Sequence, residues 1–201
     1  MNNNLIENLT KSIAKLPGMG PRIAKRILLH LASNKEKVLL PLIENLKKIY
    51  EQIDRCKECG NLDHHDLCSV CRDENRNHSV ICIVEEVADL WAIERANDKQ
   101  KNFSGVYHVL NGKLSASEGK GIDDLNFPTL IDRVQKNNIQ EIIIATSATI
   151  DGQTTAHFIA EILKDFNLKI TRLAHGIPLG SELDYLDDGT ISIALNHRSK
   201  I

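Results

Sequence analysis

Four of the five cysteines in this chain lie in one short stretch, as two C-x-x-C pairs with eight residues between them: Cys56 and Cys59, then Cys68 and Cys71. A C-x-x-C turn brings two sulfurs to the spacing of two ligands on one zinc ion, and two such turns supply a tetrahedral set of thiolates. The pattern therefore predicts one structural Zn²⁺ per chain. Because four thiolates fill the coordination sphere, no position remains for an activated water or a substrate.

Other uses of these cysteines are less consistent with the sequence. Two disulfides would need an oxidising compartment, and the N-terminus lacks the basic start, apolar core and cleavage site of a secretory signal, so we expect a cytoplasmic protein. His64 and His65 lie between the pairs and could replace one ligand, but the regular pairs favour four sulfurs. Cys82, in the apolar run 80–84, is expected to be a small buried hydrophobe.

A second candidate site is the glycine turn in front of a basic helix near the N-terminus. The two glycines allow a tight hairpin with positive φ, and Pro21 suits the first turn of the following helix. Free amides at that helix start, with the positive end of its dipole, form a natural phosphate seat. Cations follow within two turns, so we expect sequence-independent contact with the DNA backbone. The residues assigned to this contact are Gly18, Gly20, Arg22, Lys25 and Arg26.

The same helix is expected to have an apolar face opposite its cations. That stripe consists of Ile23, Ala24, Ile27, Leu28 and Leu31. The structural alternative is a helical hairpin with an ordinary solvated basic face. The charge distribution favours a polyanion at this end, because residues 1–55 hold ten Lys and Arg against five Asp and Glu, whereas the whole chain has a net charge of −2.

The elements that position these residues follow from periodicity. Residues 5–16 and 38–53 repeat apolar side chains at helical spacing, on either side of the basic helix. After the cysteines, apolar runs alternate with amphipathic stretches, which predicts a parallel sheet covered by helices on both faces, with function at the carboxyl ends of its strands. The expected strands are 79–86, 105–110, 141–145 and 168–173, and the expected helices are 87–96, 128–137 and 154–165.

Two of these strand ends are polar, and together they resemble the Toprim domain of topoisomerases, primases and related nucleases. In that fold one strand ends in a glutamate, which Glu85 matches, and a later strand ends in Asp-x-Asp followed by an acidic residue and a glycine. Here Ser147 and Thr149 stand where the paired aspartates belong. Mg²⁺ requires carboxylates that neutral hydroxyls replace poorly, so the departure predicts a Toprim-like fold with no catalytic residues.

The acidic residues around these strand ends have two interpretations. Glu85, Glu86, Asp89 and Asp151 could form an acidic patch for a basic protein partner, or they could be ordinary strand-end polarity. The enzymatic alternative is a Toprim nuclease or primase with an unusual metal site. A zinc-dependent nucleobase deaminase is disfavoured because its H-x-E and P-C-x-x-C signature is absent.

The last part of the chain completes a wider resemblance. The glycine turn and basic helix at 16–27 resemble a helix-hairpin-helix DNA-binding motif. This motif, the four-cysteine loop, the Toprim-like sheet and the tail 175–190, in this order, resemble the RecR family of bacterial recombination mediators. The tail of that family is described as Walker-B-like, but this chain has no G-x-x-x-x-G-K-[ST] phosphate loop. Asp187-Asp188-Gly189 is therefore as readily a turn before a last helix.

The predicted fold is a multidomain α/β protein: a helix-hairpin-helix module at 1–55, a zinc finger at 56–78, a Toprim-like parallel α/β sheet at 79–175 and a short C-terminal oligomerisation segment at 176–201. The resemblance implies a nucleoid-associated homodimer or homotetramer ring. Such a ring would bind single- and double-stranded DNA and act with RecO and RecF to load the strand-exchange recombinase. Aromatic residues make up only 4% of the chain, so stacking of bases on aromatic side chains is not indicated. The longest uncharged apolar-rich run, 142–150, is too short to predict a membrane span.

Overall fold

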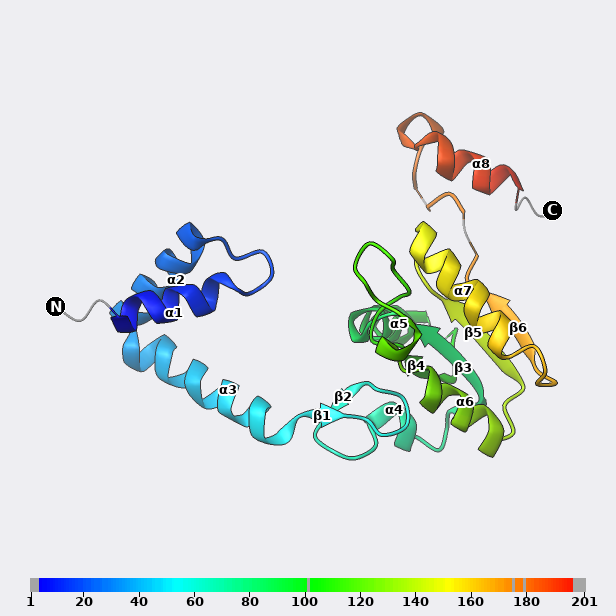
Figure 1. Ribbon diagram of the computed structural model, residues 1–201, viewed down its shortest axis with the longest axis horizontal. Coiled ribbons are helices and arrows are strands. Elements are labelled where there is room, and N and C mark those ends of the chain that lie inside the picture. Colours follow the sequence, from blue (N-terminus) through cyan, green and yellow to red (C-terminus); the bar gives the residue numbers. More distant parts are fainter. Residues whose placement is uncertain (1–3, 101, 175, 179, 197–201) are drawn as a thin grey trace. The chain divides into compact units, whose positions relative to one another are not determined.

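The computed structural model describes residues 4–100, 102–174, 176–178 and 180–196, so the end of the expected C-terminal segment, 197–201, lies outside the described residues. The chain divides into two compact units, Met1–Ile53 and Asp54–Ile201. Figure 1 shows helices alone in the first unit, and strands with covering helices in the second. Neither unit contains a described helix that is long and apolar enough to cross a membrane.

The first unit is the expected helical hairpin followed by a long helix. Its elements are α1 (Asn4–Ala14), α2 (Pro21–Ser33), a π-helical segment (Lys35–Leu39) and α3 (Leu40–Gln52). Helices α1 and α2 pack on each other, and the π-helical segment leads directly into α3. Helical spacing was thus predicted correctly over 38–53, although the stretch is divided between two kinds of helix.

The apolar stripe expected on α2 is only partly correct. Ala24, Leu28 and Leu31 are buried, but the Ile23 side chain is 46% exposed and Ile27 is half-buried. At 100° per residue, the three buried positions share one side of the helix, which faces α1, and Ile23 is rotated away from it. Ile23 and Ile27 instead line a surface pocket together with Arg26.

The second unit begins with the cysteine loop. A short antiparallel pair, β1 (Asp54–Arg55) and β2 (Leu62–Asp63), precedes the one-turn helix α4 (Ser69–Arg72). Each C-x-x-C pair lies at a turn: the first follows β1 and the second surrounds the start of α4. The antiparallel pair therefore brings the two turns back toward each other.

The sheet consists of four parallel strands in the order β4-β3-β5-β6. The chain moves from β3 to its neighbour on one side and then crosses to the other side, so right-handed connections place α5 on one face and α6 and α7 on the opposite face (Figure 1). The bounds are β3 (Asn77–Val84), α5 (Val87–Gln100), β4 (Gly105–Val109), α6 (Phe127–Lys136), β5 (Glu141–Ala145), α7 (Ile150–Ile162) and β6 (Lys169–Arg172), with a 3₁₀ turn at Ile122–Asp124.

Successive residues of the central strands face opposite layers, and both layers are closed. In β4 every residue is buried: the Tyr107 hydroxyl donates to Glu94 of α5 at 2.6 Å, and His108 Nε2 donates to the carbonyl of Asn126, before α6, at 2.8 Å. Arg76 also binds Glu94 of α5 and donates to the Gly105 carbonyl of β4 at 3.1 Å, which ties the segment after α4 to both the helix and the sheet. The prediction of a sheet covered on both faces is confirmed.

Strand positions agree with the sequence to within two residues, whereas helix ends differ more. Helix α7 begins at Ile150 rather than at residue 154, because the Thr149 hydroxyl caps it by accepting the Gly152 N–H at 3.2 Å. Asp151 consequently lies in the first helical turn and not in a loop. Helix α5 extends to Gln100, beyond the expected end at residue 96.

The C-terminal segment contains a 3₁₀ turn (Leu183–Tyr185) and the helix α8 (Asp188–Asn196). The Asp187 carboxylate accepts hydrogen bonds from the Thr190 N–H at 3.0 Å and the Thr190 hydroxyl at 2.7 Å. These bonds satisfy donors at the helix start and hold the pKa of Asp187 below its usual range. The Asp187-Asp188-Gly189 sequence is thus a turn that starts the last helix.

Candidate functional site

The four cysteines form a buried cluster with the spacing of a metal centre. Their Sγ atoms all lie within 4.8 Å of one another, and those of Cys59 and Cys68 are 3.5 Å apart. This separation excludes a disulfide and is close to the edge of a zinc–sulfur tetrahedron, about 3.8 Å for Zn–S bonds of about 2.3 Å. All four are free thiols with at most 6% exposure. The donor set fits one Zn²⁺ with four sulfur ligands and no open position.

Backbone donors support two of the sulfurs. The Asn61 N–H donates to Cys59 Sγ at 3.4 Å, and the Cys68 N–H donates to Cys56 Sγ at 3.3 Å. Such bonds stabilise the thiolate form that binds metal.

The two histidines in the loop do not join the cysteines. His64 and His65 group instead with Asp63, whose carboxylate accepts both of their backbone N–H groups as well as the Ser69 N–H at the start of α4. Both rings are exposed. Their sequence position suggested replacement ligands, but the turn points them outward. Cys82 is also separate, in the interior of β3 at 3% exposure, where burial raises its pKa to about 12.

The cysteine loop is fastened to the sheet through several residues between and beside the cysteines. The Val109 N–H of β4 donates to the Cys59 carbonyl at 2.8 Å, and Trp91 Nε1 of α5 donates to Asn61 at 3.2 Å. Gly60 adopts φ +78°, and a β-carbon there would meet the Val109 carbonyl at 3.3 Å. The loop and the sheet therefore share one continuous core.

An ion pair between a buried arginine and a half-buried glutamate adds to this connection. Arg133 of α6 is 5% exposed and donates through Nη2 to Glu58, inside the first C-x-x-C, at 3.1 Å, and through Nη1 to the Tyr107 carbonyl at 2.7 Å. The buried site and the arginine together lower the pKa of the adjacent His108 to about 3, with burial the larger cause. Sequence reasoning missed this pair because Glu58 is only a spacer residue within the first C-x-x-C, and Arg133 stands in no motif and at no strand end.

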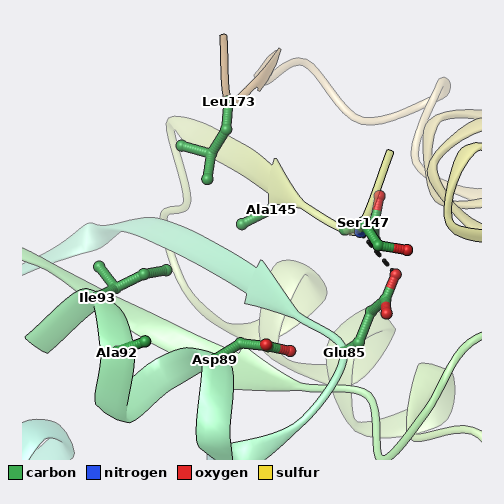
Figure 2. A pocket seen from close by; sticks show the side chains of 8 residues that line it. Glu85, Asp89, Ala92, Ile93, Ala145, Ser147 and Leu173 are labelled. Carbon is green, nitrogen blue, oxygen red and sulfur yellow. Dashed lines mark hydrogen bonds between the residues drawn. The ribbon is translucent and has the colours of Figure 1, made fainter. Parts of the chain in front are cut away.

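The strand-end site lies where the chain reverses its direction across the sheet, between β3 and β5. Glu85 follows β3, and its Oε1 accepts the Ser147 N–H, after β5, at 2.7 Å (Figure 2). The hydroxyls of Ser147 and Thr149 lie 2.7 Å apart. Lys113 and Arg172, which the sequence did not single out, reach the Thr149 hydroxyl at 3.4 Å and the Ser147 carbonyl at 3.4 Å.

A glycine is required beside this turn. A β-carbon on Gly152 would lie 2.3 Å from the Ser147 carbonyl oxygen, 2.4 Å from its hydroxyl and 2.9 Å from Glu85 Oε1. The first turn of α7 can therefore approach the Glu85 carboxylate only if residue 152 has no side chain. This packing accounts for the glycine at position 152.

The four acidic residues of the proposed patch are not all brought together. Glu85 and Asp89 line one pocket, Glu86 is exposed beside it, and Asp151 lies on α7 outside the lining. Among the described residues, no group of three carboxylates has the spacing of a metal site. In that part of the chain, the groups of three or more potential ligands are the cysteine quartet and the group around Asp63.

The basic hairpin places its cations on the surface. Gly18 has φ +75°, Gly20 is the N-cap of α2 without a side-chain cap, and Arg22, Lys25 and Arg26 are exposed. A β-carbon at either glycine would meet nothing within 4 Å, so the backbone at the turn is open to a ligand. His30, one turn after Arg26, lines the same pocket, and extending the basic face by one turn would have found it.

Comparison with known proteins agrees with a parallel sheet that follows a four-cysteine loop. The family model described as "Toprim domain" matches residues 79–174, and the model of the RecR four-cysteine zinc finger domain matches residues 53–73. The fold and the cysteine site thus define a Toprim-domain protein with a four-cysteine zinc finger. The model "RecR, C-terminal" matches residues 176–199.

Full-length relatives identify the family. The chain is 51% identical to "Recombination protein RecR" of Sinorhizobium fredii over 98% of this chain and 96% of the relative. It is 50% identical, with the same coverage of each, to the proteins of that name from Rhizobium leguminosarum and Bartonella henselae. The chain belongs to the RecR family of recombination proteins.

Proposed function

We propose that the chain is a non-enzymatic mediator of recombinational DNA repair that binds single- and double-stranded DNA without reading its sequence. The observation that carries the proposal is the exposed trio Arg22, Lys25 and Arg26 at the open start of α2, in a chain of the RecR family. In this role it acts with RecO and RecF partners to load the strand-exchange recombinase onto single-stranded DNA. The proposed location is the cytoplasm, in association with the nucleoid.

The hairpin supports phosphate binding through two independent features. The first amides of α2 have no side-chain cap, so they can donate to an anion along the helix dipole. The cations beside them are exposed and add long-range attraction to the backbone. Neither feature depends on base identity, which is why the expected binding is sequence-independent.

The test is a double substitution, Arg22→Ala with Arg26→Ala. Affinity should fall by a similar factor on unrelated duplexes, and the slope of log K against log salt should lose about 0.9 for each phosphate contact removed. The control is Lys47→Ala with Lys48→Ala, which removes the same charge from the exposed face of α3. Equal affinity loss in both double variants would contradict the assigned contact and indicate a general charge effect.

The strand-end site supports the absence of catalysis. Two-metal chemistry needs carboxylates to hold the ions that stabilise both oxygens of the reacting phosphate, and Ser147 and Thr149 offer neutral hydroxyls that hydrogen-bond each other. Cleavage and primer-synthesis assays with Mg²⁺ and with Mn²⁺ should give no turnover. Turnover that Glu85→Ala abolishes would make the protein a Toprim enzyme.

Assembly into a ring is supported by the apolar side chains that α3 leaves exposed. No residue of this helix is buried, and Leu42, Ile43, Leu46 and Ile49 are between 40% and 57% exposed. A helix with such a stripe needs a covering surface, and a second copy of the chain is the proposed one. Light scattering with and without DNA should show a mass of two or four chains. A monomer under both conditions would contradict the ring.

A further inference from the structure

The turn between the two cysteine pairs carries a second group of metal-ligating side chains. Asp63 is the last residue of β2, and His64 and His65 follow it directly. Each of the three offers one ligand atom, and these atoms all lie within 4.8 Å of one another. The group includes none of the buried cysteines, so an ion bound here would be separate from the ion of the quartet.

The backbone of the turn holds the three side chains together. Asp63 Oδ1 accepts the His64 N–H at 2.7 Å and the His65 N–H at 3.2 Å, and Oδ2 accepts the Ser69 N–H at 3.0 Å. These bonds fix the carboxylate at the start of the turn, where its side chain is only 11% exposed, whereas that of His64 is 61% exposed. A fixed carboxylate therefore lies beside two imidazoles that an ion in solvent can reach.

The distances within this group suit a small cation. His64 Nδ1 lies 3.1 Å from Asp63 Oδ1. Two ligands at about 2.0–2.1 Å from a tetrahedral zinc are separated by about 3.3 Å, which is close to this value. The two rings are also adjacent, with centroids 3.8 Å apart. The largest separation in the group exceeds the tetrahedral edge by at most about 1.5 Å, which rotation of an exposed ring about its side-chain bonds can close.

The donor types restrict which metal can bind. Imidazole nitrogen suits Zn²⁺, Ni²⁺ and Cu²⁺, whereas Mg²⁺ and Ca²⁺ prefer ligand sets made of oxygen. Two imidazoles and one carboxylate are three protein ligands, as in zinc sites that keep an open position, so water would fill the fourth. A hydrogen bond within the turn explains the contact of His64 with Asp63 but not the second imidazole beside it.

We infer that Asp63, His64 and His65 bind a second divalent transition-metal ion, with Zn²⁺ as the favoured occupant. This ion is exchangeable, because exposed side chains of one turn hold it and one ligand is water. The quartet, in contrast, encloses its ion with four buried sulfurs. Since Asp63 also accepts the Ser69 N–H, a bound ion would stiffen the segment between the two cysteine pairs.

The experiment is a calorimetric titration of the untagged full-length protein with Zn²⁺, in a buffer that does not bind metal. Elemental analysis before the titration establishes that the quartet is loaded. The wild-type protein should bind about one additional zinc ion per chain, and an excess of Mg²⁺ should not displace it. Absence of additional binding, or displacement by Mg²⁺, would overturn the inference.

Substitutions locate the second ion. His64→Gln with His65→Gln removes both imidazoles and should abolish the additional binding, while the quartet keeps its zinc. Asp63→Asn keeps an oxygen for the backbone N–H groups but loses the charge, and it should weaken the additional binding about tenfold or more. The matched control is His30→Gln with His157→Gln, which removes two exposed histidines elsewhere and should bind as the wild type does. An equal loss in this control would indicate diffuse binding to histidines and contradict the site.

Nuclear magnetic resonance of the ¹⁵N-labelled imidazole rings gives a readout that does not depend on counting ions. Zn²⁺ should shift the ring nitrogens of His64 and His65 to saturation and leave those of His78, which contacts the Asp73 carbonyl, unchanged. Equal shifts at His78 would refute selective binding at the turn. Loss of the quartet zinc from the His64 and His65 double variant would assign the two histidines to the structural site and refute a second ion.

Discussion

The two units of the molecule differ in how completely they bury their own apolar side chains. In the sheet unit the central residues Ile81, Ile83 and Ile142 have no exposure, and the cysteine loop belongs to the same core. In the helical unit the described buried residues are Ala24, Leu28 and Leu31, while α3 exposes its entire apolar stripe. The sheet unit therefore covers its apolar core with its own elements, whereas the helical unit, which carries the basic hairpin, leaves the apolar side chains of α3 exposed.

The same difference in burial distinguishes the cysteine quartet from the basic hairpin and the strand-end pocket. The cysteine quartet is closed, has a complete ligand set and is continuous with the core, so it stabilises structure. The hairpin and the strand-end pocket are open to solvent and keep free donors or acceptors, so they are suited to recognition. Residue type and spacing already predicted a structural role for the cysteines, and the burial of all four is consistent with that role.

Of the changes considered, removal of a cysteine ligand should lower the stability of the sheet unit the most. Cys71→Ser should lower the free energy of unfolding of the sheet unit by about 5 kcal/mol or more, because the loop shares its core. Trp91, the only tryptophan, contacts Asn61 of the loop, so its fluorescence during urea titration reports this unit directly. The control Cys82→Ala should cost about 1 kcal/mol. A folded, metal-free variant that has lost only DNA binding would contradict a structural role.

Acid should weaken the sheet unit next most strongly. The folded state holds the pKa of His108 at about 3 against an ordinary 6.5, so between these values only the unfolded chain binds the proton. This contribution to stability is complete above pH 6.5 and should decline by at most about 1.4 kcal/mol per pH unit down to pH 3. Urea titrations from about pH 7 to about pH 4 measure the slope, and His108→Gln should reduce it. An identical slope in that variant would assign the acid sensitivity elsewhere.

Crowding the strand-end turn should have an intermediate effect. Gly152→Ala should cost about 1–3 kcal/mol, because the added carbon cannot coexist with the present Ser147 and Glu85 positions. Gly121→Ala is the control, since its nearest neighbour would be 3.8 Å away, in ordinary contact. Thermal unfolding of the two variants compares them. Equal midpoint temperatures for the Gly152→Ala and Gly121→Ala variants would show that the strand-end turn shifts to accommodate the added carbon without loss of stability.

A charge on the exposed face of α3 should have the smallest effect on folding and a clear effect on assembly. Leu46→Glu keeps a good helix former, so helical circular dichroism should be unchanged, while the mass measured by light scattering should fall. Asn45→Glu adds the same charge at the neighbouring exposed position and should keep the wild-type mass. Unchanged mass in the Leu46 variant would show that another surface mediates association.

Sequence reasoning was most accurate where a local pattern has one physical solution. The cysteine spacing predicted the quartet, and the β-branched runs predicted four parallel strands, with Glu141–Ala145 placed at its observed bounds. The prediction of helix ends was less accurate, because a capping residue such as Thr149 sets where α7 begins. The prediction of buried side chains was also less accurate on α2, where the rotation of the helix leaves Ile23 exposed. Those outcomes depend on which neighbours pack against the helix.

The sequence by itself determined the ligand set, the order of elements and the presence of hydroxyl residues, Ser147 and Thr149, after the third strand, because these are matters of residue type and spacing. Only the tertiary structure decided that Glu58 pairs with Arg133, that Glu85 and Asp89 share a pocket without Asp151, and that the cysteine loop belongs to the core of the sheet. These contacts join residues that are distant in the chain. Their geometry follows from strand order and helix packing, which spacing along the sequence does not encode.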